Sequence, residues 1–100
     1  MSDMTQQEKN DLLIEYAKKG ATGGLLMALQ AGADVNHKGH YSKTALHHAA
    51  IEGHAALAQV LLGAGANINA ADRGGRTALY FARDRGHPEM EALLWQHGAE

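Results

Sequence analysis

Histidine is the residue type in this sequence with the most evident capacity for chemistry. There are seven histidines among 100 residues, and a neutral imidazole can bind zinc or exchange a proton near neutral pH. His48 and Glu52 are four positions apart, a spacing that places two possible metal ligands on one face of a helix. No motif brings a third ligand to them, and the chain has no cysteine. We therefore expect no metal site and no cofactor.

Patterns typical of catalysis are also missing from the sequence. Ser42 lies in no G-x-S-x-G motif, and no glycine-rich loop ending in lysine precedes a helix. Without cysteine there is neither a thiol nucleophile nor a disulfide framework. The sequence therefore predicts no catalytic residue, and a protein that is not an enzyme.

Net charge and hydropathy limit the classes of partner that the sequence predicts. The formal net charge is −2, which gives no bulk attraction to nucleic acid or to an anionic membrane. No stretch approaches the roughly 18 consecutive apolar residues of a membrane span, and the polar segment 1–10 lacks the apolar core of a signal peptide. We expect a cytoplasmic protein that binds neither nucleic acid nor membrane.

The elements that must hold these side chains follow an internal repeat of 33 residues. The second and third units match at Thr44-Ala45-Leu46 and Thr77-Ala78-Leu79, at Gly53-His54 and Gly86-His87, and at Gly65-Ala66 and Gly98-Ala99. The first unit shares Gly20, Gly32-Ala33 and Asn36 with this pattern. The register never slips, so no insertion separates the units.

Each unit carries the apolar spacing of two short amphipathic helices, and glycine stands where each helix must end. Thr5 to Glu8 matches a capping box, which predicts a first helix that begins near Thr5 and is longer than its counterparts. Gly23 and Gly24 each cost on the order of 1 kcal/mol relative to alanine inside a helix. We therefore expect the second helix of the first unit to fray or to begin late.

The segment from Thr44 to Ala70, T-A-L-H-H-A-A-I-E-G-H-A-A-L-A-Q-V-L-L-G-A-G-A-N-I-N-A, resembles an ankyrin repeat. The resemblance covers roughly residues 5 to 100. It implies an all-α ankyrin-repeat solenoid of three stacked helix-turn-helix units joined by β-hairpin-type loops. The single domain, 1–100, would comprise an N-terminal capping repeat (5–36), a middle repeat (37–69) and a C-terminal capping repeat (70–100). Departures from the family pattern at Gly39 and Ser42 predict an altered or looser turn in the hairpin 36–43.

The resemblance also assigns roles to several polar residues. His47, His54 and His87 occupy family positions that make structural hydrogen bonds to neighbouring loops. Asn36 and Asn69 hold the position of an asparagine that stabilises the hairpin, and such asparagines can also resemble hydroxylase substrates. These assignments leave His37, His40, His48 and His97 as the histidines without a family role.

In the family, hairpin tips and first helices line a concave surface that binds another protein. Eight of the nine basic residues lie in hairpins or near first-helix ends, in a stripe from Lys18 and Lys19 through Lys43 and Arg76 to Arg85. The stripe suggests an acidic or phosphorylated partner segment, although a solvated face is the plainer interpretation of any single charge. Tyr41 is the best anchor candidate. The predicted partner-binding residues are His40, Tyr41, Lys43, His48, Ile51, Glu52, Arg73, Arg76 and Arg85.

The favoured function is a non-enzymatic adaptor or inhibitor that acts as a monomer on a protein partner. The alternative is a structural or assembly protein that associates with its own copies through the ends of the repeat stack. Trp95, Met90 and Leu94 in the last helix make this second function conceivable. Exposure of Met90 and Trp95 distinguishes the two, since a terminal repeat should turn a polar face to water.

Overall fold

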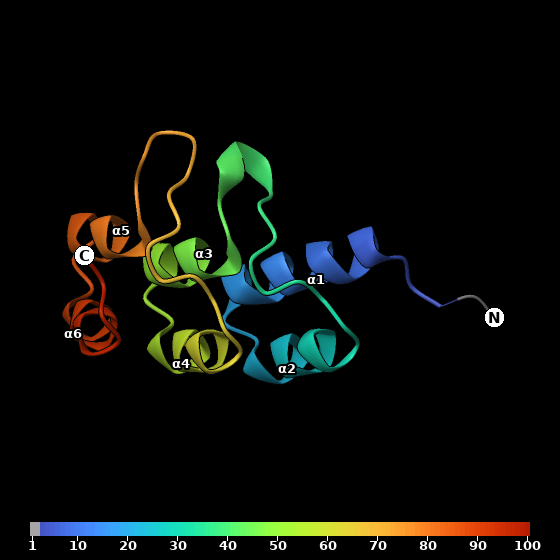
Figure 1. Ribbon diagram of the computed structural model, residues 1–100. Coiled ribbons are helices and arrows are strands. Elements are labelled where there is room, and N and C mark those ends of the chain that lie inside the picture. The colour runs from blue at the N-terminus through green and yellow to red at the C-terminus, as the bar shows by residue number, and fades with distance from the viewer. Residues whose placement is uncertain (1–2) are drawn as a thin grey trace.

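The computed structural model describes residues 3–100, which form six helices in antiparallel pairs. The helices are α1 (Gln6–Lys19), α2 (Thr22–Gln30), α3 (Ala45–Glu52), α4 (Ala55–Gly63), α5 (Ala78–Asp84) and α6 (Pro88–Gln96). Figure 1 shows α1, α3 and α5 in one row and α2, α4 and α6 in a second row beneath it. The prediction of an all-α stack of three helix pairs is confirmed.

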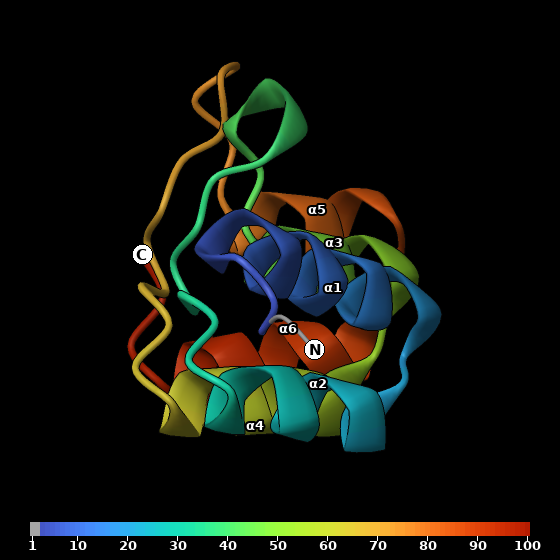
Figure 2. The ribbon, with the colours of Figure 1, turned by 90° about the vertical axis from the view of Figure 1, so that its right-hand side faces the viewer.

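The loops that join the pairs rise from the helices as two-armed hairpins (Figure 2). One backbone hydrogen bond closes each of them, from Gly39 N to Lys43 O at 2.9 Å and from Asp72 N to Arg76 O at 2.9 Å. Residues 3–100 contain no β-strand, and the first hairpin carries a 3₁₀ turn instead, η1 (His40–Ser42). Each loop therefore reverses direction as a hairpin does, but within residues 3–100 its two arms do not pair as β-strands.

The first helix begins as the capping box predicts. Thr5 N donates to Glu8 Oε1 at 2.9 Å, and Glu8 N donates to Thr5 Oγ1 at 3.1 Å, so two otherwise free amides are satisfied. The hydrogen bond from the Thr5 backbone also lowers the pKa of Glu8. α1 has 14 residues, against 8 in α3 and 7 in α5. The expected greater length is confirmed.

The expected delay of α2 is wrong. α2 begins at Thr22, which aligns with Ala55 and Pro88 at the starts of α4 and α6. The glycines do not delay it because tertiary packing outweighs propensity. A Cβ at Gly24 would lie 2.7 Å from the ring of Tyr16, so this glycine lets a large side chain of α1 cover α2.

One continuous core runs through the three pairs. α3 packs against both α1 and α5, and α4 contacts both α2 and α6. Small residues such as Ala17, Ala50 and Ala82, which are fully buried, let the helices approach closely. Of the three helix pairs in residues 3–100, the middle one has neighbours on both sides. Stability in such a stack comes largely from contacts between repeats.

Two histidines join each repeat to the one before it. His54 Nε2 lies 3.2 Å from Lys18 O, and His87 Nε2 lies 2.9 Å from Ile51 O. The His87 ring covers Gly53, where φ is +75° and a Cβ would lie 2.7 Å from the ring. A left-handed helix end and a close approach both require glycine there. The structural role expected of His54 and His87 is confirmed.

The C-terminal end of the stack is closed by a polar cluster on α5 and α6. The Arg83 guanidinium lies 3.2 Å from Glu91 Oε2 and 5.4 Å from the Trp95 ring. Trp95 Nε1 donates to the same carboxylate at 3.3 Å. Met90 is fully buried, whereas Trp95 is 48% exposed. This end therefore combines one half-exposed aromatic with charged groups that can face water.

Candidate binding surface

The hairpin 36–43 ends in a tight, strained turn. Tyr41 and Ser42 have φ angles of +57° and +60°, a left-handed conformation that costs a non-glycine residue about 1–2 kcal/mol. Ser42 N donates to Gly39 O at 3.0 Å, and Lys43 N donates to His40 O at 3.1 Å. The turn is altered, as Gly39 and Ser42 predict, but it is tight rather than looser. It projects the Tyr41 side chain, which is 65% exposed.

A buried carboxylate organises the second hairpin and fastens it to the first. Asp72 Oδ1 accepts hydrogen bonds from Gly74 N and Arg76 N, both at 2.9 Å. Its other oxygen lies 3.0 Å from Lys43 Nζ and 3.3 Å from Arg76 Nη2. Burial alone would raise the pKa of Asp72, but the Arg76 amide and the two cations outweigh it and hold the pKa well below its ordinary value.

These bonds change the predicted basic stripe. The side chain of Lys43 is only 15% exposed, and Lys43 and Arg76 also lie 5.1 and 5.2 Å from the ring of Phe81. Both cations, which the sequence assigned to partner binding, are therefore paired with Asp72, although the side chain of Arg76 stays 43% exposed. Fewer unpaired cations are therefore available to a partner at the hairpins than the sequence suggested.

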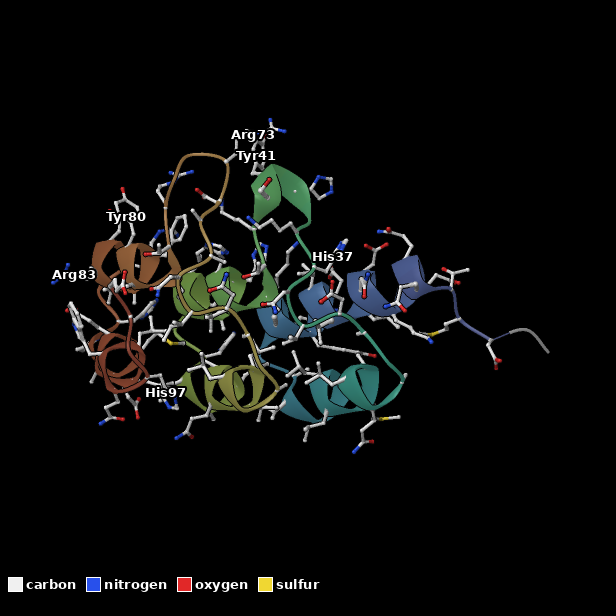
Figure 3. All side chains as sticks on the ribbon, in the orientation of Figure 1. His37, Tyr41, Arg73, Tyr80, Arg83 and His97 are labelled. Carbon is white, nitrogen blue, oxygen red and sulfur yellow. The ribbon has the colours of Figure 1, made fainter. Side chains whose placement is uncertain are left out.

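Tyr41 and Arg73 form the contact between the two hairpin tips. Arg73 N donates to Tyr41 O at 2.8 Å, and the Arg73 guanidinium lies 5.7 Å from the centre of the Tyr41 ring. Figure 3 shows both side chains together at the summit of the hairpins. A guanidinium beside an aromatic face keeps its N–H groups free for a carboxylate or phosphate. The pair therefore places the exposed ring of Tyr41 next to the guanidinium of Arg73.

His47, at the base of the hairpins, holds the two together from below. Nδ1 accepts from Thr44 N at 3.0 Å, so Nε2 carries the proton and donates to Arg76 O at 2.9 Å. Burial is the main cause that lowers the pKa of His47. The structural role expected of His47 is confirmed, and this histidine is not free for a ligand.

The asparagines at the feet of the hairpins also bridge repeats. Asn36 Oδ1 accepts from Asn67 N at 2.7 Å, and Asn36 Nδ2 donates to Gly65 O at 3.2 Å. Asn69 Oδ1 accepts from Glu100 N at 3.1 Å. The expected side-chain to backbone hydrogen bonds are present, but they join each asparagine to the backbone of the next unit.

His40 and His48 line a shared hollow of about 330 Å³ between α1, α3 and the hairpin 36–43. Burial, followed by the nearby charge of Lys18, lowers the pKa of His48 to about 4. His48 is therefore neutral at pH 7. Within residues 3–100, no three His, Asp or Glu side chains are grouped so that they could hold a metal ion.

The remaining predicted site residues lie near the C-terminal ends of the first helices, whereas the hairpins enter those helices at their N-terminal ends. Ile51 is partly buried and packs on the core, and Glu52 is exposed. Arg85 pairs with Asp84 at 3.5 Å. The predicted residues therefore separate into a hairpin group and this distal group.

Sequence reasoning missed two features of this surface. It gave no role to Asp72, although this aspartate precedes Gly74 and Gly75, and an aspartate before a glycine-rich turn often bonds the turn amides. It also gave no role in binding to the acids of α1, such as Asp11 and Glu15. The structure places Asp11 beside His37 and His40 in one hollow.

Comparison with known families agrees with this architecture. A family model described as ankyrin repeats (3 copies) matches residues 12–100. No curated protein sequence matches the chain. None of the helices in residues 3–100 is long and apolar enough to span a membrane. Ankyrin repeats are in general non-enzymatic modules for protein–protein interaction. With six helices in three stacked pairs and most of its length covered by the family model, the chain belongs to the ankyrin-repeat family.

Proposed function

We propose that this chain is an adaptor or inhibitor that acts as a monomer and binds one protein partner through its hairpin tips and first helices. The observation that carries the proposal is the exposed Tyr41–Arg73 pair, held by a backbone hydrogen bond of 2.8 Å between two repeats. Strained backbone at Tyr41 and Ser42 supports it, because strain of this kind concentrates at ligand-binding positions. Catalysis forms no part of the proposed function.

An acidic or phosphorylated segment suits this surface best. Arg73 is exposed and belongs to none of the ion pairs of residues 3–100, so its donors are available to a carboxylate or phosphate. Lys38 lies on the neighbouring hairpin 36–43, where its Nζ donates to Ala71 O at 3.1 Å, and it belongs to none of the ion pairs of residues 3–100. The recognition site is therefore centred on Arg73 rather than on the longer stripe through Lys43 and Arg76.

The test compares Arg73→Glu with a control on the opposite surface. Gln59→Glu combined with Gln96→Glu changes the net charge by the same two units, at exposed positions in the hollow between α4 and α6. Proteins captured from cell extract by the wild type and by the control, but not by Arg73→Glu, are purified and titrated calorimetrically. Tyr41→Ala is expected to weaken binding about tenfold or more, as is typical of an aromatic anchor.

Equal capture by the wild type and Arg73→Glu would overturn the proposal, provided that circular dichroism shows equal helicity. Arg76 is left unchanged in this design because it bonds Asp72, so its loss would disturb the fold as well as the surface.

Self-association through the ends of the stack remains the second candidate, and one observation favours it. An apolar hollow of about 260 Å³ at the N-terminal end is lined by Met4, Leu12, Tyr16, Gly24, Met27, Ala28 and Ala31. Met27 is 70% exposed. The charged cluster at the C-terminal end weighs against contact there. Sedimentation velocity at high concentration separates the two functions, because assembly requires a sedimentation coefficient that rises with concentration.

A further inference from the structure

The N-terminal part of α1 occupies the place that a hairpin occupies in the other repeats. In the 33-residue register Leu12 aligns with Ala45, the first residue of α3, so residues 6–11 extend α1 beyond the shared helix. Asn10 is buried, and its Oδ1 accepts from Asp34 N at 2.8 Å, while Gln6 Nε2 donates to Gly32 O at 3.0 Å. The extension is therefore fixed to the loop that follows α2.

A groove runs between this extension and the hairpin 36–43. Two hollows form it, of about 480 and 330 Å³, and they share Asp11, Gly39 and His40. The larger hollow reaches Tyr41 and Arg73 at the hairpin tips, and the smaller one reaches Lys18 and His48. In Figure 3 His37 lies between α1 and the hairpin, at the base of the hairpin. Together the two hollows extend from the hairpin tips to α1 and α3.

The two walls of the groove carry opposite charge. α1 contributes Asp11 and Glu15, which are exposed, and Asp11 Oδ1 accepts from Gln7 Nε2 at 2.8 Å. The hairpins contribute Lys38 and Arg73. None of the ion pairs within residues 3–100 crosses the groove. On α1, Glu15 pairs with Lys18 of the same helix at 3.6 Å, whereas Asp11 belongs to none of these ion pairs. Asp11 and Arg73, one on each wall, therefore keep opposite charges that a ligand can meet.

We propose that this groove binds an extended segment of the protein partner that carries an acidic side chain toward Arg73 and a basic side chain toward Asp11. The inference rests on the proposed function and adds an order of charges to it. A segment of uniformly acidic character is disfavoured, because it would place like charge against Asp11 and Glu15. Charge order then fixes the direction in which the segment lies.

The probe is a library of random 12-residue peptides displayed on phage and selected on the intact protein. We expect enriched peptides to carry one acidic and one basic residue at a constant separation. Synthetic peptides of the enriched sequence should bind Asp11→Lys and Arg73→Glu about tenfold or more weakly than wild type. Gln59→Lys, an exposed change on the opposite surface, serves as the control and should bind as wild type does.

The double variant Asp11→Lys with Arg73→Glu supplies the decisive comparison. It should bind a peptide with the acidic and basic positions exchanged more tightly than it binds the original peptide. Peptides that lose affinity for Tyr41→Ala but show no charge order, or that bind Asp11→Lys unchanged, would overturn this inference and leave the proposed function standing. If no selected peptide responds to any change at Asp11, Tyr41 or Arg73, both proposals fail.

Discussion

The ring of Tyr16 lies over Gly24, so that a Cβ at Gly24 would be 2.7 Å from two ring carbons. The equivalent residues of the middle repeat are Ala49 and Leu57, both buried. In the first repeat the large residue is therefore on the first helix and the small one on the second, whereas the middle repeat has the reverse arrangement. Tyr16 covers α2 at an end of the stack where no preceding helix pair is described.

This relationship predicts different outcomes for two neighbouring glycines. Gly23→Ala should raise the free energy of unfolding by about 0.5 kcal/mol, because its Cβ meets nothing within 4 Å and alanine favours the helix. Gly24→Ala should be less stable than Gly23→Ala, since the Tyr16 ring must move. Urea unfolding followed by circular dichroism measures both. In a Tyr16→Ala background the two substitutions should become equivalent; a persistent difference would contradict this account.

The carboxylate of Asp72 should be the most sensitive polar group of the hairpins. Asp72→Asn leaves Lys43 and Arg76 without their buried partner, and we expect a loss of about 3 kcal/mol at pH 7. Because the folded pKa lies below the unfolded value of about 3.9, the stabilisation is complete above that pH and is lost as the pH falls below it. The variant should lack this acid-dependent loss. Asp84→Asn, an exposed control, should change stability by less than about 0.5 kcal/mol.

Stability should also fall between pH 6.5 and about 4 because of His48. Its pKa is lowered to about 4 by burial and by Lys18, so the unfolded chain takes up a proton in this range that the folded chain does not. Stability is then highest above pH 6.5 and declines as the pH falls toward 4. His48→Gln should flatten this part of the profile, measured by urea unfolding at several pH values. A residual slope is expected from His47, whose pKa is lowered too.

The C-terminal polar cluster should keep the protein monomeric. The middle repeat has His47, Ala50, Ala58 and Leu62 at the positions of Tyr80, Arg83, Glu91 and Trp95. Replacing all four by the middle-repeat residues removes the charges and exposes an apolar helix pair. Sedimentation should then show concentration-dependent association, whereas Tyr80→His alone should not produce it. A monomeric quadruple variant at high concentration would show that the cluster is unnecessary.

The sequence alone predicted the helices, their order and the positions of the turns between them. A 33-residue register and glycine at helix ends depend on local geometry, so they can be read without a structure. The start of α2 was misjudged because the helix propensity of Gly23 and Gly24 was given more weight than the register, which aligns Thr22 with Ala55 and Pro88. The contact of Tyr16 with Gly24 could not be predicted, because it joins two helices and propensity is a property of one segment.

The surface could be predicted only in outline. Tyr41 was identified as exposed because its place on a hairpin tip follows from the register. The engagement of Lys43 by Asp72 joins residues 29 positions apart, and the distribution of charge along the chain gave no sign of it. The groove beside Asp11 was missed for the same reason, since its two walls come from different repeats.

The hydrogen bonds between repeats also determine how the chain can fold. His54 to Lys18 and His47 to Arg76 span 36 and 29 residues, about one unit each, and no such bond among residues 3–100 joins the first pair of helices to the last. Each repeat can therefore dock on its neighbour by closing a loop of about that length, so the loss of chain entropy that opposes folding stays small. During synthesis the first two helix pairs can dock while the third is still inside the ribosome, and each later unit then adds to a surface that is already formed.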